Sequence, residues 1–487
     1  MFLGLDLGTT NVKAVVADAD GNVLARGAAP VGVRHVGTAG VEQDIEEIWS
    51  AAVGAVGRAA GAVGGARVRA VGVSSQGGAL QLRGADGRPV GPVISWMDGR
   101  GAPCDRELTE RFGSRWFAEH VGHGQSGIAV GQLLRLRQEA PEMLGRAVRI
   151  GFVGDAIVER LCGRAAHDAT SLSIGLLYNP WLGRAEPDLL DELGVEDGQL
   201  PDLLPADAQA GALVHEAADQ LGLPRGIPVS PAVHDQYASA LGCGAVQAGD
   251  VMFGAGTAWV LLAASDRLIA PVVPRAFVCA HLVEGLYGQM LSLVNGGSSV
   301  AWAARLMGVE PAGTDELDSL VEDAAPGAGG VRFRPLLAPQ GGAGLPPGTR
   351  GALSGLRLRH GRAHVLRAVV EGLACELARH LRFLTDAGVP LGRLVMCGGA
   401  AASRTTPQIV ADVAGAPVAC CSESDTSAFG AAVLARGLGE PGRPLADIAR
   451  DTAPDARPVE PGANAALYAE LAGQYAASLA ADSGAGP

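Results

Sequence analysis

The sequence lacks the features that would direct it to a membrane or to nucleic acid. No uninterrupted apolar stretch reaches about 18 residues, the length that spans a bilayer. Basic residues number 38 against 51 acidic ones, so the net charge of -13 argues against nucleic acid and anionic membrane surfaces as partners. Because no basic segment precedes an apolar run at the N-terminus, we expect a cytoplasmic protein.

The cysteines show no spacing typical of metal sites or disulfides, and lysine is scarce. The eight cysteines include no Cys-x-x-Cys pair and no His/Cys metal spacing, and the adjacent Cys420 and Cys421 have poor geometry for bridging each other. We therefore expect reduced thiols, most of them buried. Lys13 is the only lysine in 487 residues. This length predicts two or more domains, and the 71 glycines suit many tight turns between strands and helices.

One short pattern occurs twice. The sequence DLGTT at residues 6–10 and the sequence GAGTA at residues 254–258 each lie between two apolar runs, which predicts strand, glycine turn, strand. Glycine lets backbone N–H groups approach an anion closely, and threonine adds a hydroxyl donor, so each turn is a candidate phosphate cradle. A lone turn of this kind is usually only a hairpin. Two copies on the order of 250 residues apart, a domain length, suggest one nucleotide held by two domains.

The N-terminal region predicts a mixed sheet with crossover helices. Two β-rich runs around Asp20-Gly21 indicate a hairpin. An amphipathic run at 49–62 predicts a helix, and 68–73 predicts a strand that ends in polar residues. Ligands gather at the carboxyl ends of strands in such sheets, which is where Asp6, Ser75 and Gln76 fall.

The rest of the chain divides near residues 245–250, which gives predicted domains 1–245 and 246–487. Residues 111–223 predict a helical, less regular lobe, with its clearest helices at 130–139 and 154–161. Further buried strands are predicted at 227–233 and 391–397, the second followed by a helix at 408–414. The segment 327–348 is rich in glycine and proline and predicts an ordered loop or a flap.

Asp235 follows the buried strand at 227–233 and opens a helix, which would hold its carboxylate rigidly. Taken alone, it is more readily interpreted as a helix N-cap. Together with Asp6 and the two turns, it suits phosphoryl transfer, with Asp235 accepting a hydroxyl proton and Asp6 orienting Mg²⁺ through water. We expect His234 to be structural rather than a second base.

Three further motifs carry weaker signals. Residues 94–100 offer an aromatic face, a carboxylate and a guanidinium, as a polyhydroxylated ligand needs, although a surface loop with a helix cap has the same pattern. Gly398-Gly399 at a strand end can let a flat base or ribose lie against the backbone, or can serve packing only. Gly430 predicts a tight helix contact without direct chemistry.

Taken together, these motifs resemble those of the FGGY family of carbohydrate kinases, in the actin-like, ribonuclease-H-like ATPase superfamily. The resemblance covers essentially the whole chain, and the motifs follow the family's order. Its most specific part is GALSGL at 351–356, followed after seven residues by HVLRAVVE at 364–371, which looks like the family's C-terminal signature.

The resemblance implies an α/β fold of two actin-like domains, each a mixed sheet plus helices, flanking a nucleotide cleft whose closure excludes water. It implies ATP and Mg²⁺ as cofactors and transfer of the γ-phosphoryl to a sugar hydroxyl, with Asp235 as general base. The implied ligand residues are Ser75, Gln76, Gly77, Trp96, Asp98 and Arg100 for the sugar, Gly8, Thr9, Thr10, Lys13, Gly256 and Thr257 for the phosphates, Gly398, Gly399 and Ser403 for adenosine, and Asp6 for the metal.

The sugar is less clear than the reaction. The segment at 96–100 looks most like that of xylulokinases, which phosphorylate a ketopentose. The substrate segment of xylulokinases usually reads Gln-Met-His-Gly, whereas the corresponding residues Ser75–Gly78 of this chain contain no histidine. The family's Gly-Glu-Arg-Thr-Pro stretch is replaced at 339–344, and its N-terminal signature lysine is missing near Gln132. Another ketose, a polyol or a sugar acid stays open as substrate, as does a non-transferring actin-like ATPase. A catalytically silent sugar sensor would be expected to lose Asp6 or Asp235. The oligomeric state stays open, a homodimer included.

Overall fold

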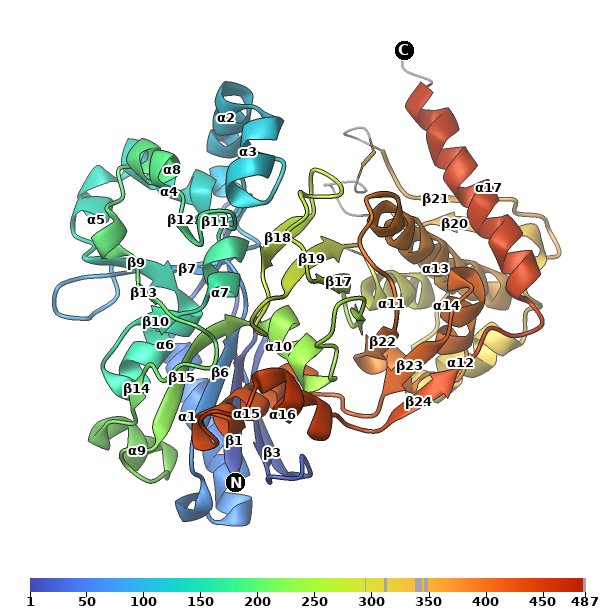
Figure 1. Ribbon diagram of the computed structural model, residues 1–487. Helices are drawn as coiled ribbons and strands as arrows, with labels where there is room; N and C mark the ends of the chain where they lie inside the picture. The colour runs from blue at the N-terminus through green and yellow to red at the C-terminus, as the bar shows by residue number, and fades with distance from the viewer. Residues whose placement is uncertain (294, 311–312, 338–343, 346–348, 485–487) are drawn as a thin grey trace. The chain divides into compact units, whose positions relative to one another are not determined.

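The computed structural model describes residues 1–293, 295–310, 313–337, 344–345 and 349–484 (Figure 1). Residues 339–343 of the replaced family stretch, and parts of the predicted loop or flap at 327–348, lie outside this range. The chain forms two compact units. The first contains residues 1–247, 266–288 and 425–453, and the second contains residues 248–265, 289–424 and 454–487. The division of the chain into domains 1–245 and 246–487 remains a prediction.

The first unit is built on a mixed sheet in the order β13-β10-β15-β6-β1-β2-β3, with β14 paired to β15. The antiparallel strands β1, β2 and β3 confirm the predicted strand, turn and strand around residues 6–10 and the predicted hairpin at Asp20-Gly21. The strands of this sheet are β1 Phe2–Leu7, β2 Asn11–Ala17, β3 Val23–Pro30, β6 Val71–Ser75, β10 Ala166–His167, β13 Asp202–Leu203, β14 Gly211–Ala212 and β15 Pro228–His234.

Two smaller sheets and several helices complete this unit. The predicted helices at 49–62, 130–139 and 154–161 are confirmed as α1, α4 and α6. The helices are α1 Ile45–Val63, α2 Ala102–Phe112, α3 Ser114–Val121, α4 Ala129–Glu139, α5 Pro141–Gly145, α6 Val153–Cys162, α7 Ala169–Ile174, α8 Pro187–Leu193, α9 His215–Leu221, α10 Asp235–Gly242, α15 Thr426–Gly439 and α16 Leu445–Asp451. The two smaller sheets contain β4 Arg34–Val36, β5 Gly40–Gln43, β7 Leu80–Arg83, β8 Val93–Ile94 and β9 Arg149–Phe152 in one, and β11 Tyr178–Asn179 and β12 Arg184–Ala185 in the other. Strand β18 Phe277–Ala280, in neither of these sheets, also falls within the residues of this unit.

The expected helical lobe at 111–223 needs a correction. Strands β10 and β13 from this region extend the main sheet beyond β15, and β9 joins the sheet β4-β5-β8-β7-β9. Strands of two residues carry no measurable periodicity, which is why the sequence pattern does not reveal them.

Helix α15 packs on α10 and on the main sheet through glycine, as predicted for the helix contact at Gly430. A Cβ at Gly430 would lie 1.8 Å from the carbonyl oxygen of Ala238 in α10, and one at Gly4 in β1 would lie 1.9 Å from that of Ala428. No side chain fits in such spaces, so backbone lies directly on backbone. This packing brings the N-terminus of α15 to the edge of the sheet where β1 and β6 end.

The second unit contains strands in the order β19-β17-β16-β22-β23-β24. The predicted strand, turn and strand around residues 254–258 are confirmed as the antiparallel pair β16 and β17, and β22 runs parallel to β16. The elements are β16 Val251–Ala255, β17 Trp259–Ser265, β19 Tyr287–Ser292, β20 Arg332–Arg334, β21 Ala352–Ser354, β22 Leu394–Cys397, β23 Val418–Cys421, β24 Ala456–Val459, α11 Gly297–Leu306, α12 Thr314–Glu322, α13 Arg362–Asp386, α14 Thr406–Ala414 and α17 Ala465–Gly484.

Candidate active site

Three parallel strands of the first unit end side by side. In the ladder, Leu7 of β1 is paired with Ser75 of β6, and Ser75 is paired with His234 of β15. The polar residues that follow these strands therefore share one edge of the sheet, as the sequence predicts. Ser75 itself is buried, and its hydroxyl donates to the carbonyl of Gln76, so it supports this edge from within.

Asp235 begins α10 directly after β15, with its carboxylate about one quarter exposed (27%). Burial raises its pKa to about 6, against hydrogen bonds from Gln236 that lower it. The N-cap interpretation of Asp235 is wrong, because His234 is the N-cap and its Nδ1 accepts from the N–H of Gln236 at 3.4 Å. Asp235 is therefore the first residue of α10 rather than its cap, and its carboxylate accepts hydrogen bonds from Gln236.

Asp6 carries the second carboxyl group of this edge. Burial raises its pKa to about 6, and the nearby carboxylate of Asp235 adds to this rise. Its Oδ1 accepts hydrogen bonds from the hydroxyls of Ser74 and Ser427, each at 2.9 Å. Ser427 is in α15, 421 residues further along the chain, so no local pattern in the sequence points to it.

Thr9 of the first turn is held by residues assigned to the sugar. Its hydroxyl donates to Oε1 of Gln76 at 2.9 Å and accepts from the indole Nε1 of Trp96 at 3.0 Å. Gln43, which the sequence does not single out, donates to the carbonyl of Thr9 and accepts from the amide of Gln76. The ring of Trp96 remains 47% exposed. The first turn and an exposed aromatic face therefore form one hydrogen-bonded group.

Asp98 and Arg100 form a closed ion pair next to Trp96. Their charged groups approach to 2.6 Å, and Arg100 also contacts Glu42 at 2.8 Å. Asp98 further accepts from the backbone N–H of Val41 and from the amide of Gln132. Burial would raise the pKa of Asp98, but these hydrogen bonds outweigh it and lower the pKa below its ordinary value. Its carboxylate is fully enclosed and caps the short 3-10 helix at Gly99–Gly101, as the alternative interpretation expects.

Lys13 lies on β2 and pairs with Asp425, which directly precedes α15, at 2.8 Å. Arg26 of β3 approaches the same carboxylate at 3.4 Å. Thr10 is exposed, and its backbone carbonyl accepts from Val31. The ion pair with Asp425, from the distant segment 425–453, thus holds the only lysine of the chain near the first turn.

In the second unit the turn at 254–258 is held by backbone contacts. The N–H groups of Gly297 and Ser298, at the start of α11, donate to the carbonyls of Gly256 and Thr257, each at 3.0 Å. Gly398 has φ +85, and a Cβ there would lie 3.1 Å from the backbone of Ala255. The predicted adenosine segment and the second turn therefore meet within this unit, with the Cβ direction of Gly399 open.

Ser403 is 3% exposed, and its hydroxyl donates to Asp318 of α12 at 2.6 Å. Asp318 also accepts from the hydroxyl of Thr405 at 2.6 Å and from the N–H of Arg404 at 2.8 Å. Burial would raise the pKa of Asp318, but these bonds lower it. Ser403 therefore holds the loop between β22 and α14 in shape.

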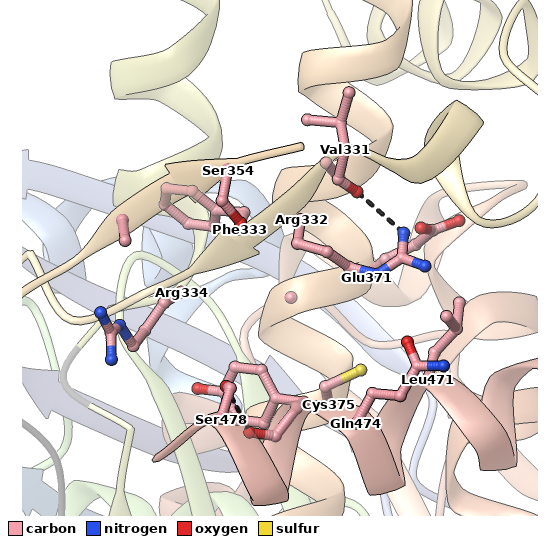
Figure 2. Close-up of a pocket in the computed structure, with 14 residues that line it drawn as sticks. Val331, Arg332, Phe333, Arg334, Ser354, Glu371, Cys375, Leu471, Gln474 and Ser478 are labelled. Atoms are coloured by element: carbon pink, nitrogen blue, oxygen red, sulfur yellow. Dashed lines mark hydrogen bonds between the residues drawn. The ribbon is translucent and has the colours of Figure 1, made fainter. Parts of the chain in front are cut away.

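Glu371, at the end of the C-terminal signature, is a buried centre of hydrogen bonds. Its Oε1 accepts from the N–H of Gly327, Nε of Arg367 and the hydroxyl of Tyr468. A cavity of about 290 Å³ lies beside it (Figure 2). It is lined by β20, β21, α13 and α17, and Figure 2 shows Cys375 of α13 among the lining residues. The signature thus joins α13 to α17 within the second unit.

Within the parts of the chain that the structure describes, no cluster of three or more His, Cys, Asp or Glu side chains could hold a metal ion. Asp6 and Asp235 supply two carboxylates, which matches a Mg²⁺ ion that keeps most of its water and phosphate ligands. In the same described ranges, no helix combines the length and apolar character needed to cross a membrane.

Comparison with known proteins identifies the class. The glycine turns and the two carboxyl groups at the sheet edge suit a phosphotransferase with an alcohol group as acceptor, and the family models and relatives show that class. Residues 1–242 match the model "FGGY family of carbohydrate kinases, N-terminal domain", and residues 251–436 match the corresponding C-terminal domain. The chain belongs to the FGGY family of carbohydrate kinases.

Similar proteins include several activities. The chain is 28% identical over 460 residues to a xylulose kinase of Escherichia coli (strain K12), with 92% of each chain covered. It is 30% identical over 466 residues to a glycerol kinase of Alkalilimnicola ehrlichii, again with 92% of each covered. The crystal structure of a xylulose kinase from Rhodospirillum rubrum matches with a TM-score of 0.89 at 27% identity, covering 99% of this chain and 98% of that one.

Proposed function

We propose that this ATP-dependent carbohydrate kinase phosphorylates a ketopentose such as D-xylulose, with Asp235 as general base. The observation that carries the proposal is the pair of carboxyl groups, Asp6 and Asp235, at one sheet edge with pKa values raised to about 6. A carboxylate with such a pKa is ionised at neutral pH and still accepts a proton better than an ordinary aspartate. The exposed part of Asp235 leaves it open to a substrate hydroxyl.

Mg²⁺ fits the donor chemistry of this edge. Hard oxygen ligands suit the ion, and kinase sites hold it with one or two carboxylates together with phosphate oxygens and water. Asp6 would hold Mg²⁺ through water, and the ion would neutralise charge on the phosphoryl group when bound. The two serine hydroxyls on Oδ1 of Asp6 orient the carboxyl group for this role.

The remaining residues divide between nucleotide and sugar. Gly8, Thr9, Thr10 and Lys13 of the first turn, and Gly256 and Thr257 of the second, would bind phosphates, with Gly398 and Gly399 against the adenosine. Trp96 would stack on the C–H face of the sugar, and Gln76 and Gly77 would border it. Because Asp98, Arg100 and Ser403 are engaged in the contacts above, we assign them supporting roles at these sites. A cytoplasmic location belongs to the same proposal, because ATP is the phosphoryl donor.

The test is ATP consumption and phosphosugar formation with Mg²⁺ and a panel of ketopentoses, ketohexoses, polyols and sugar acids, D-xylulose and D-ribulose included. A large rise with one pentulose supports the proposal. A rise only with a polyol, another ketose or an acid keeps the mechanism and discards the ketopentose. ADP formed at one rate with every acceptor, and no phosphosugar, contradicts transfer and leaves an ATPase.

A further inference from the structure

The turn between β10 and α7 holds the end of β15 on the side opposite β6. Strand β10 pairs with β15 at one position, His167 with Ala232. Just beyond it, the N–H of Asp168 donates to the carbonyl of Ala232 at 3.0 Å, and the hydroxyl of Ser171 donates to the same carbonyl at 3.1 Å. These contacts attach the turn to β15 close to the end of the strand at His234.

Thr170 of this turn makes the contact that lies nearest to the proposed base. Its hydroxyl oxygen accepts a hydrogen bond from the N–H of His234 at 3.0 Å. The same hydroxyl donates its proton to Oδ1 of Asp168 at 2.7 Å. All three residues are 5% exposed or less. A buried N–H that loses its acceptor has no water to replace it, so the Thr170 oxygen fixes the backbone position of His234.

Asp168 sets the direction of the Thr170 hydroxyl. A hydroxyl can rotate, and a strong acceptor on one side leaves its lone pairs facing the other side. Burial raises the pKa of Asp168 to about 6, so the carboxylate is ionised at neutral pH and the bond is charge-assisted. Asp168 also caps α7, because its side chain accepts from the N–H of Ser171. The carboxylate thus orders the whole turn that faces β15.

We propose that Thr170, oriented by Asp168, is a positioning residue for Asp235. This rests on the proposed function, since it takes Asp235 as the general base. His234 is the N-cap of α10 and Asp235 is the next residue, so the backbone that Thr170 holds leads directly to the reacting carboxylate. Misplacing a reacting group by about 1 Å can cost on the order of a hundredfold in rate. Thr170 should therefore affect turnover and leave the binding of sugar and ATP unchanged.

The test removes the hydroxyl of Thr170 and keeps the size of the side chain. Thr170→Val lacks the acceptor, whereas Thr170→Ser retains it. With the best acceptor sugar, kcat of Thr170→Val should fall roughly 10–100-fold while KM for sugar and ATP stays within about threefold, and kcat of Thr170→Ser should stay within about threefold of the wild type.

Thr452→Val is the matched control. Thr452 is a buried threonine of the same unit, and its hydroxyl donates to the carbonyl of Ile448 at 2.7 Å. This variant loses one buried hydrogen bond, as Thr170→Val does, and should keep the kcat of the wild type.

A double variant separates positioning from a general structural role. In Asp235→Asn, the further change Thr170→Val should lower the residual kcat by less than about threefold, because the group that Thr170 positions is already absent. An equal loss in both backgrounds, an unchanged kcat in Thr170→Val, or the same loss in Thr452→Val would overturn the inference.

Thermal unfolding checks that each variant is folded. If Thr170→Val is not, Asp168→Asn replaces it, because asparagine still caps a helix but carries no charge, and kcat should fall roughly threefold to tenfold only where Asp235 is present. A loss of turnover in Asp235→Asn with no loss in the Thr170 or Asp168 variants rejects the inference alone. If Asp235→Asn keeps full turnover, or no acceptor yields a phosphosugar, the proposed function fails and the inference fails with it.

Discussion

The two glycine turns are alike in sequence and differ in what holds them. Thr9 of the first turn is fixed by the side chains of Gln43, Gln76 and Trp96, which come from separate elements. The second turn is held by backbone N–H groups at the start of α11, and Thr257 is exposed. The side-chain network fixes the position of Thr9, as a catalytic site requires. A turn without such side-chain contacts is suited to bind an anion through its backbone N–H groups.

The acidic residues that we assign to phosphoryl transfer also differ between the two units. Both carboxyl groups with a pKa near 6 that we assign to transfer, Asp6 and Asp235, belong to the first unit. The second turn is contacted by the start of α11 and by Gly398, and its sequence contains no carboxylate. We therefore propose that the first unit carries the chemistry and that the second turn supplies much of the nucleotide affinity.

The largest expected effect comes from removing the first unit's carboxylates. Asp235→Asn should reduce phosphosugar turnover by roughly 10²–10⁴-fold, because the hydroxyl then lacks its proton acceptor. Turnover at saturating ATP and sugar measures this effect. Asp207→Asn, at an exposed acid of the same unit, is the control and should keep full turnover. If Asp235→Asn retained more than a tenth of the activity, Asp235 would not be the base.

The pH dependence should be the next largest effect. Since the base must be ionised, kcat/KM should rise about tenfold per pH unit below pH 6 and level off above it. The stability of the folded protein changes with pH in the opposite direction. A carboxyl group whose pKa is raised in the folded protein stabilises it fully below its ordinary pKa of about 4, and this contribution is lost as pH rises through about 6.

Thermal unfolding of Asp235→Asn and the wild type tests this predicted pH dependence of stability. Asp235→Asn should unfold at a higher temperature than the wild type at pH 8, since it removes an ionised group from a partly buried position, and the difference should shrink at pH 4. A larger difference at pH 4 than at pH 8 would contradict the raised pKa.

A smaller effect should follow from closing the space at Gly398. Gly398→Ala places a Cβ 3.1 Å from the backbone of Ala255 and forces a positive φ on alanine, so the second turn must move. We expect the Kd for ATP to rise roughly tenfold, that is about 1.4 kcal/mol, with little change in turnover at saturating ATP. Gly399→Ala has open space and should bind ATP as the wild type does.

An effect of only a few-fold should come from the helix packing of the first unit. Gly430→Ala separates α15 from α10 and should lower the free energy of unfolding by roughly 1–3 kcal/mol. It should also loosen Ser427 from Asp6 and lower turnover a few-fold. The control Gly57→Ala, in open space on α1, should instead raise the free energy of unfolding by up to about 1 kcal/mol. Denaturant titration measures both.

Much of this arrangement could be predicted from local patterns. The strands around both turns, helix α1, and Asp235 at the end of β15 have periodicity or turn residues that mark them. The partners Ser427 and Asp425 could not be found this way, because they reach the first turn only when glycine contacts seat α15 on the sheet. The enclosure of Asp98 depends on Val41 and Gln132, which are distant in sequence.

The most direct measurement is the affinity of ATP for Asp235→Asn, by calorimetry with Mg²⁺, beside its turnover. If the first unit supplies the chemistry and the second most of the nucleotide affinity, the Kd should stay within about threefold of the wild type while turnover is lost. A Kd that rises more than about tenfold would mean that Asp235 acts in nucleotide binding, and would contradict the division between the two units.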